Sequence, residues 1–241
     1  MRLTILTIIL ISFIRLVHGQ DFKYLEPNLG DSCSIIVTKI DSVNFYEQLV
    51  YIDYKTNSNL KERVADFRLT ENRLNEISQT YYELVKNVNA KGSKFNHQLP
   101  EKWIKLNTYK GEWILYDDIE FNPRYILTDS TLVNFNMDGL YSNIIKEHKS
   151  KGKNYQFTLF DLTFDTPPSN REYTLNIKII EDENMISVWE FIRDGRKYYS
   201  LMIPESKKIN FPIIGIMTTD LMGDETEMLD KIDFDTLIEN E

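Results

Sequence analysis

Between Trp103 and Met217 the sequence is a series of short extended runs separated by turn residues, and this pattern limits the fold more than any other feature. The runs are rich in β-branched and aromatic residues, and the breaks hold Gly, Pro, Asn or Asp. Asp194-Gly195 is the clearest turn, because a two-residue hairpin loop of type I′ needs positive φ at its central positions. The runs read WIKL, EWILYD, RYILTD, TLVNF, LYSNII, YQFTLFDLTF, EYTLNIKII, MISVWEFI, KYYSLMI and FPIIGIM.

About eight to ten strands joined by hairpin-sized loops indicate an antiparallel meander, and a meander of this length can close into an up-and-down barrel. We therefore predict a mainly β fold, without the long crossover helices of a parallel α/β sheet. Alternation is cleanest from Glu172 to Ile180, which predicts one buried and one solvated face there. Another barrel, a sandwich or a mixed α+β fold are the alternatives.

Residues 20–100 differ from the meander, so we predict an N-terminal extension there and a β-barrel domain over residues 101–219. The extension contains two β-rich runs, CSIIVTKI and QLVYIDY. Apolar residues at steps of three and four then predict one helix over Glu71–Asn89. The segment Asn59–Arg68 is a weaker candidate for an additional helix.

The first 19 residues have the composition of a secretory signal peptide. An apolar run, LTILTIILISFI, follows Arg2, and small residues precede an expected cut between Gly19 and Gln20. The run is shorter than the roughly 18 residues needed to cross a bilayer, so we predict a secreted or periplasmic protein that does not span the membrane. Cys33, the single cysteine of the chain, has no disulfide partner within it.

The net charge of −9 is concentrated at the C-terminal end. From Asp220 to Glu241 nine acidic side chains accompany one base, Lys231, and the spacing matches no EF-hand loop. We predict a short helix around Asp224–Asp230 followed by a frayed acidic tail. Nucleic-acid binding is disfavoured because the chain is acidic, and the basic stretch Lys146–Lys153 is interpreted as a solvated hairpin loop.

Motifs of catalytic, metal or cofactor sites are absent from the sequence. It contains no H-E-x-x-H, G-x-S-x-G, P-loop or G-x-G-x-x-G pattern, so we assign no catalytic residue, no metal ligand and no cofactor. His97 and His148 stand in polar segments and are predicted to be surface imidazoles. Acidic residues near strand ends leave an envelope hydrolase with paired carboxylates as an alternative. They are Asp117, Asp118, Glu120, Asp161 and Asp165.

The start of the meander contains Gly111-Glu112-Trp113, which resembles the G-x-W motif that opens the first strand of lipocalin-like proteins. The resemblance covers Trp103 to about Leu229. It implies a barrel whose Trp113 closes one end against a basic residue of the last strand, with Arg193 and Arg196 as candidates. It also implies an open end that admits an apolar small molecule.

The main functional hypothesis is a non-enzymatic binding protein for a small apolar ligand or an envelope component. An alternative is a protein-interaction or inhibitor module that uses the helix over Glu71–Asn89 or the acidic tail and has a barrel filled by side chains. Aromatic residues in the strands are candidates to line a ligand pocket, although core packing is the better explanation for the same residues. The candidates are Tyr116, Tyr125, Phe157, Trp189 and Tyr199.

Overall fold

The computed structural model describes residues 33–39, 47–54, 56–67, 95–117, 122–136, 139–162, 172–218 and 229–239. The chain divides into two compact units, Met1–Tyr54 with Ile214–Met228, and Lys55–Ile213 with Leu229–Glu241. The predicted signal peptide and the predicted helix over Glu71–Asn89 lie outside the described residues.

The first unit contains the two β runs predicted for the N-terminal extension. Strands β1 (Cys33–Lys39) and β2 (Glu47–Asp53) pair antiparallel. Their register places Cys33 opposite Asp53 and Lys39 opposite Glu47. Strand β12 (Ile213–Thr218) follows β2 in the sheet order.

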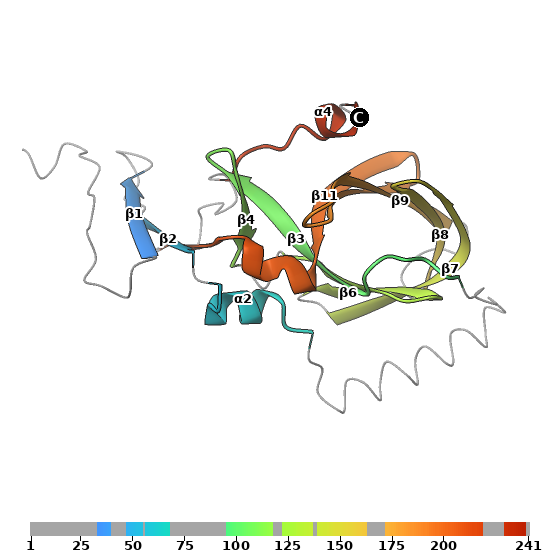
Figure 1. The fold of residues 1–241 in the computed structure, drawn as a ribbon, viewed down its shortest axis with the longest axis horizontal. Coiled ribbons are helices and arrows are strands. Elements are labelled where there is room, and N and C mark those ends of the chain that lie inside the picture. The colour runs from blue at the N-terminus through green and yellow to red at the C-terminus, as the bar shows by residue number, and fades with distance from the viewer. Residues whose placement is uncertain are drawn as a thin grey trace, which may run out of the picture. The chain divides into compact units, whose positions relative to one another are not determined.

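The second unit contains a closed antiparallel barrel of eight strands, as the turn pattern predicted (Figure 1). The order around the ring is β3-β11-β10-β9-β8-β7-β6-β5, and β5 pairs with β3 to close it. The ring strands are β3 (Lys102–Tyr109), β5 (Arg124–Leu127), β6 (Thr131–Asn136), β7 (Gly139–Lys151), β8 (Asn154–Asp161), β9 (Glu172–Glu181), β10 (Ile186–Arg193) and β11 (Arg196–Pro204).

Strand β4 (Glu112–Tyr116) interrupts the simple up-and-down order. It pairs with Asn107–Tyr109 of β3, whereas β5 pairs with Lys102–Ile104 of the same strand. The β3–β4 turn has positive φ at Lys110 and Gly111, which the glycine adopts without steric cost. β4 is therefore a branch from the second half of β3, outside the closed ring.

The β10–β11 hairpin confirms the predicted Asp194-Gly195 turn. Both residues have positive φ, 51° and 74°, and Arg193 lies opposite Arg196 in the ladder. The register that this turn fixes places Trp189 opposite Ser200. The same alternation carries every second side chain of β10 into the barrel.

Two apolar clusters lie on opposite sides of the barrel wall. The inner cluster takes at least one buried residue from each of the eight ring strands, and a set shared by all strands of a ring must lie inside it. The outer cluster joins β3, β4, β10 and β11 to the helix α2 (Asn59–Val64). Because β10 and β11 are covered on both faces over part of their length, successive residues are buried at Ile186–Trp189 and at Ser200–Pro204, whereas burial alternates in β9.

Helix α2 confirms the weaker of the two helix predictions in the extension. The Ser58 side chain accepts a hydrogen bond from the Leu60 backbone N–H at 3.2 Å, which caps the first turn. Val64 and Ala65 are buried in the outer cluster. The helix ends at Val64 and does not extend to Arg68 as we expected.

The prediction of a frayed tail is wrong, because Phe234–Glu239 forms helix α4. The Asp233 carboxylate accepts hydrogen bonds from the Thr236 backbone N–H at 3.1 Å and from its hydroxyl at 2.7 Å, which supports the first turn. Most of the helix predicted around Asp224–Asp230 lies outside the described residues. A short 3₁₀ helix, η2 (Glu205–Asn210), follows β11.

Candidate functional site

Three of the five aromatic candidates meet inside the barrel. Phe157 and Trp189 are fully buried, and Tyr125 is nearly so. The Trp189 ring lies 5.1 Å from Tyr125 and 5.4 Å from Trp103, centroid to centroid. The Trp189 indole N–H donates to Ser187 Oγ at 3.0 Å. These rings pack against one another as core, and burial raises the pKa of the Tyr125 hydroxyl above its usual range.

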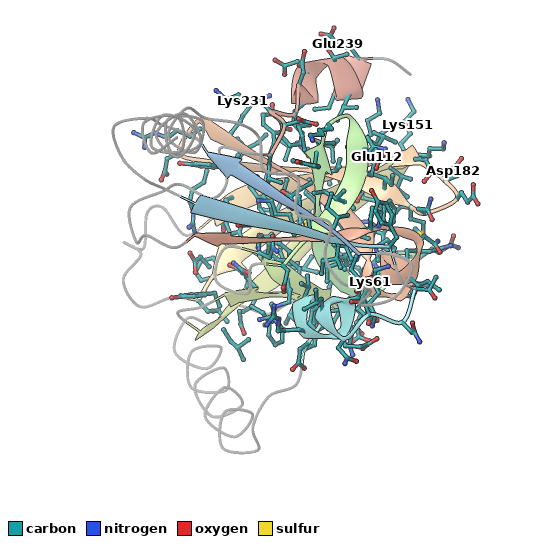
Figure 2. All side chains as sticks on the ribbon, turned by 90° about the vertical axis from the view of Figure 1, so that its left-hand side faces the viewer. Lys61, Glu112, Lys151, Asp182, Lys231 and Glu239 are labelled. Atoms are coloured by element: carbon teal, nitrogen blue, oxygen red, sulfur yellow. The ribbon has the colours of Figure 1, made fainter. Side chains whose placement is uncertain are left out.

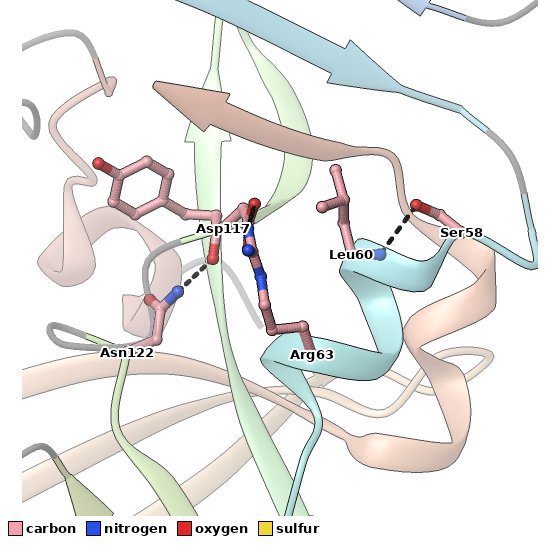
Figure 3. A network of polar contacts seen from close by, with 6 residues as sticks. Ser58, Leu60, Arg63, Asp117 and Asn122 are labelled. Atoms are coloured by element: carbon pink, nitrogen blue, oxygen red, sulfur yellow. Dashed lines mark hydrogen bonds and ion pairs between the residues drawn. The ribbon is translucent and has the colours of Figure 1, made fainter. Parts of the chain in front are cut away.

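The other two candidates, Tyr116 and Tyr199, lie away from this interior group. Tyr116 is buried at the end of β4, and its backbone oxygen accepts a hydrogen bond from the Asn122 amide (Figure 3). Tyr199 lies on the outer face of β11, where its ring stacks on Phe234. The five aromatic side chains therefore do not form one site.

The G-x-W residues belong to the β3–β4 hairpin. Gly111 donates its backbone N–H to Asp230 Oδ2 at 2.8 Å, and Trp113 is half-buried against the outer cluster. Arg193, one of the two candidate bases, pairs with Asp161 and lies over the Tyr173 ring. Arg196, the other candidate, is exposed on β11.

Trp103 is the tryptophan that the first ring strand carries into the barrel. It is fully buried, and its indole N–H donates to the Pro100 carbonyl at 2.6 Å. Sequence reasoning missed it, although it begins the WIKL run.

Two of the acidic residues that could serve a hydrolase are among the described residues, and each of them pairs with an arginine. The Arg63 Nε–H of α2 donates to Asp117 Oδ1 at 3.0 Å (Figure 3). The Asp117 side chain is 6% exposed. Asp161 in β8 pairs with Arg193 in β10. Asp118, Glu120 and Asp165 lie outside the described residues.

Both histidines differ from the prediction of surface imidazoles. His148 lies opposite Phe157 in the ladder and stacks on its ring at 4.8 Å, and the His97 ring is 6.4 Å away. His97 Nε2 lies 2.7 Å from the Thr128 carbonyl. Burial lowers the pKa of His148, and the charge of His97 lowers it further. The ladder register, which is not visible in the sequence, places His148 on Phe157, and the loop that contains His97 brings the second imidazole beside them.

The depressed pKa of His148 predicts a pH effect on stability. The unfolded chain binds the proton more readily, so the free energy of unfolding falls as pH is lowered through the ordinary value of 6.5. A His148→Phe variant keeps the ring stack and loses this proton. We expect its urea unfolding to depend less on pH between about 7 and 5. Equal pH dependence in the two proteins would contradict the assignment.

A pocket of about 350 Å³ lies on the outer face of the barrel, over β7 to β10 and beside α4. A row of hydrogen-bonded polar side chains crosses it. Gln156 donates to Asn176 Oδ1 at 3.0 Å, and Asn176 donates to Glu190 Oε2 at 2.6 Å. The pocket is lined by Lys149, Ser150, Lys151, Asn154, Tyr155, Gln156, Asn176, Ile177, Lys178, Val188, Glu190 and Ile238.

Glu190 is the one acidic side chain in the pocket lining, and its charge is already compensated. Lys197 Nζ lies 2.7 Å from Glu190 Oε1, and the Tyr199 hydroxyl donates to the same oxygen at 3.0 Å. Burial acts to raise the pKa of Glu190, but hydrogen bonds from Lys197, Asn176 and Tyr199 outweigh it and hold the pKa below its ordinary value. The carboxylate therefore stays ionised and bound to its neighbours.

The three lysines of the lining differ in their partners. Lys178 donates to the Ile238 carbonyl at 2.5 Å, whereas Lys149 and Lys151 pair with no carboxylate in the described part of the chain. Lys149 and Lys151 are in strand β7, not in a loop as we predicted. Lys149 and Lys151 are two residues apart, and in a strand this spacing places both side chains on the same face of the sheet.

Beyond this pocket, the described residues give little indication of a site. They contain no group of three or more His, Cys, Asp or Glu side chains placed to bind a metal ion. None of their helices has the length and apolar character to cross a bilayer. Comparison of the chain with protein-family models, with curated proteins and with solved structures finds no match.

Proposed function

We propose that the protein is a non-enzymatic binding protein, and that its ligand is a small, partly apolar molecule with an acidic group held in the outer pocket. The observation that carries the proposal is a pocket of about 350 Å³ lined by two lysines, Lys149 and Lys151, that pair with no carboxylate among the described residues. We further propose that the first 19 residues direct the protein to the secreted or periplasmic space, where it meets this ligand.

The lining suits an anionic head attached to an apolar body. Lys149 and Lys151 provide ammonium groups, which form stronger hydrogen bonds to carboxylate, sulfonate or phosphate oxygens than to neutral acceptors. Val188 and Ile238 provide apolar surface beside them. The amide row at Gln156 and Asn176 is fixed by its own hydrogen bonds, which reduces the entropy lost on binding.

The packed interior favours this outer site over a ligand inside the barrel. Trp103, Phe157 and Trp189 have no exposed surface, so a ligand among them would have to separate closely packed rings. Catalysis by paired acids receives no support from Asp117 and Asp161, because each carboxylate is neutralised by its own arginine.

The double variant Lys149→Gln/Lys151→Gln tests the proposal. The probe is anilinonaphthalene sulfonate, a fluorescent anion with an apolar body, and we expect its dissociation constant to rise about tenfold, or about 1.4 kcal/mol. Added salt should weaken binding to the wild type more than to the variant. The neutral dye Nile red should bind both proteins equally.

The matched control is Lys146→Gln/Lys153→Gln. These lysines are in the same hairpin and pair with Glu172 and Asp182, and the pocket lining does not include them. The control removes the same charge and should leave sulfonate binding within about twofold. If both double variants lose affinity equally, the pocket is not the binding site.

A further inference from the structure

The C-terminal segment 229–239 packs on the outer face of the barrel through side-chain and hydrogen-bond contacts. The Phe234 ring stacks on Tyr199, with centroids 5.2 Å apart and planes at 15°. Lys178 donates to the Ile238 carbonyl, and the Gly111 backbone N–H donates to the Asp230 carboxylate. Figure 2 shows Lys231 before α4 and Glu239 within it. These contacts, together with the hydrogen bond from the Asp230 backbone N–H to the Thr108 carbonyl at 2.9 Å, fix the segment along its length.

This docking is shallow. None of the residues of α4 is buried, although Phe234, Leu237 and Ile238 pack against the outer cluster. A helix of six residues has little stability of its own, since isolated helices shorter than about 12 residues are marginal in water. The segment is therefore held by its contacts with the barrel, and losing them would release it.

The segment combines acidic and apolar side chains in one short sequence. Its acids are separated by apolar residues that pack on the barrel, and Lys231 is its only base. The face that receives it offers an aromatic ring at Tyr199, an ammonium group at Lys178 and a backbone N–H at Gly111. The acids are Asp230, Asp233, Asp235 and Glu239, and the apolar residues that pack on the barrel are Ile232, Phe234, Leu237 and Ile238.

We propose that this face binds an acidic amphipathic segment of a partner protein, and that α4 is the occupant supplied by the chain itself. The three contacts define the partner. It presents an aromatic ring to Tyr199, a free carbonyl at its helix end to Lys178, and a carboxylate to the Gly111 N–H. The proposal does not depend on a small-molecule ligand, although Lys178 and Ile238 also line the pocket.

A partner segment must compete with α4, which is tethered beside its own site. Tethering gives an effective concentration in the millimolar range, so a free segment binds weakly while α4 is docked. Substitutions that undock α4 remove this competitor and leave Tyr199, Lys178 and Gly111 in place. The affinity for a free segment should then rise.

The experiment uses the full chain and a fluorescein-labelled peptide of residues 229–241. By fluorescence anisotropy, we expect the peptide to bind the variant Phe234→Ser/Ile238→Ser at least about tenfold more tightly than the wild type. A peptide carrying the same two substitutions should not bind. Adding Tyr199→Ala to the variant chain should abolish binding of the unmodified peptide.

Circular dichroism establishes that each variant chain keeps its β structure, and Phe234→Ala replaces the double variant if that one does not fold. Three results would overturn the proposal. The first is no peptide binding to a folded, undocked chain, and the second is equal binding of the substituted peptide. The third is a concentration-dependent dimer of the wild type that the undocking substitutions abolish, because it would assign the face to α4 of a second copy.

Discussion

Replacing Trp189 with alanine is expected to lower the free energy of unfolding by about 3–5 kcal/mol. The side chain has no exposed surface and contacts the rings of Trp103, Tyr125 and Phe191. Alanine leaves a cavity in the middle of the inner cluster, where rigid strands on all sides limit collapse. It also leaves the Ser187 hydroxyl without the indole N–H that donates to it.

Urea unfolding followed by far-UV circular dichroism measures the loss. Trp113→Ala is the matched control, because it removes the same side chain from a half-buried position on β4, outside the ring. We expect its cost to be less than half of that at Trp189. Equal costs at the two positions would show that the inner cluster is not the main source of stability.

The strands and their turns could be predicted from the sequence because their signals are local. In β9 the alternation predicted one buried face, and Leu175, Ile177 and Ile179 are buried as expected. Asp194-Gly195 predicted its hairpin because few residue pairs accept positive φ at both positions. Such signals need only a few neighbouring residues.

The branch at β4 could not be predicted, since it depends on which strand pairs with each half of β3. The EWILYD run is a strand, as expected, but β5 pairs with Lys102–Ile104 and leaves only Asn107–Tyr109 for β4. Trp113 therefore lies outside the closed ring. Closure of the barrel, a property of all its strands together, decides this pairing.

The pocket was missed for a similar reason. Its lining comes from four neighbouring strands and from Ile238 of α4, and only the ladder register brings Lys149 opposite Gln156 and Asn176 opposite Glu190. The partial burial of His148 likewise follows from its position opposite Phe157. Sequence spacing gives the face of one strand, whereas a site across strands needs the register of each pair.

Arg193→Ala is expected to lower the free energy of unfolding by about 2–3 kcal/mol, because it removes the guanidinium that pairs with the mostly buried Asp161 carboxylate. The Asp161 side chain is 7% exposed and that of Arg193 is 35% exposed, so solvent reduces the cost below that of a fully buried pair. Arg193 also covers the Tyr173 ring at 4.7 Å, a contact that alanine removes.

A double-mutant cycle with Asp161→Asn separates these contributions. Asparagine keeps the shape of the side chain without its charge, so the double variant should lose at least about 1 kcal/mol less than the sum of the single variants. The control is Lys146→Ala, which breaks the pair with Glu172 at side-chain exposures of 39% and 54% and should cost about 0.5 kcal/mol or less. Additive losses at Arg193 and Asp161 would mean that the arginine stabilises the barrel by packing on Tyr173, not by neutralising the carboxylate.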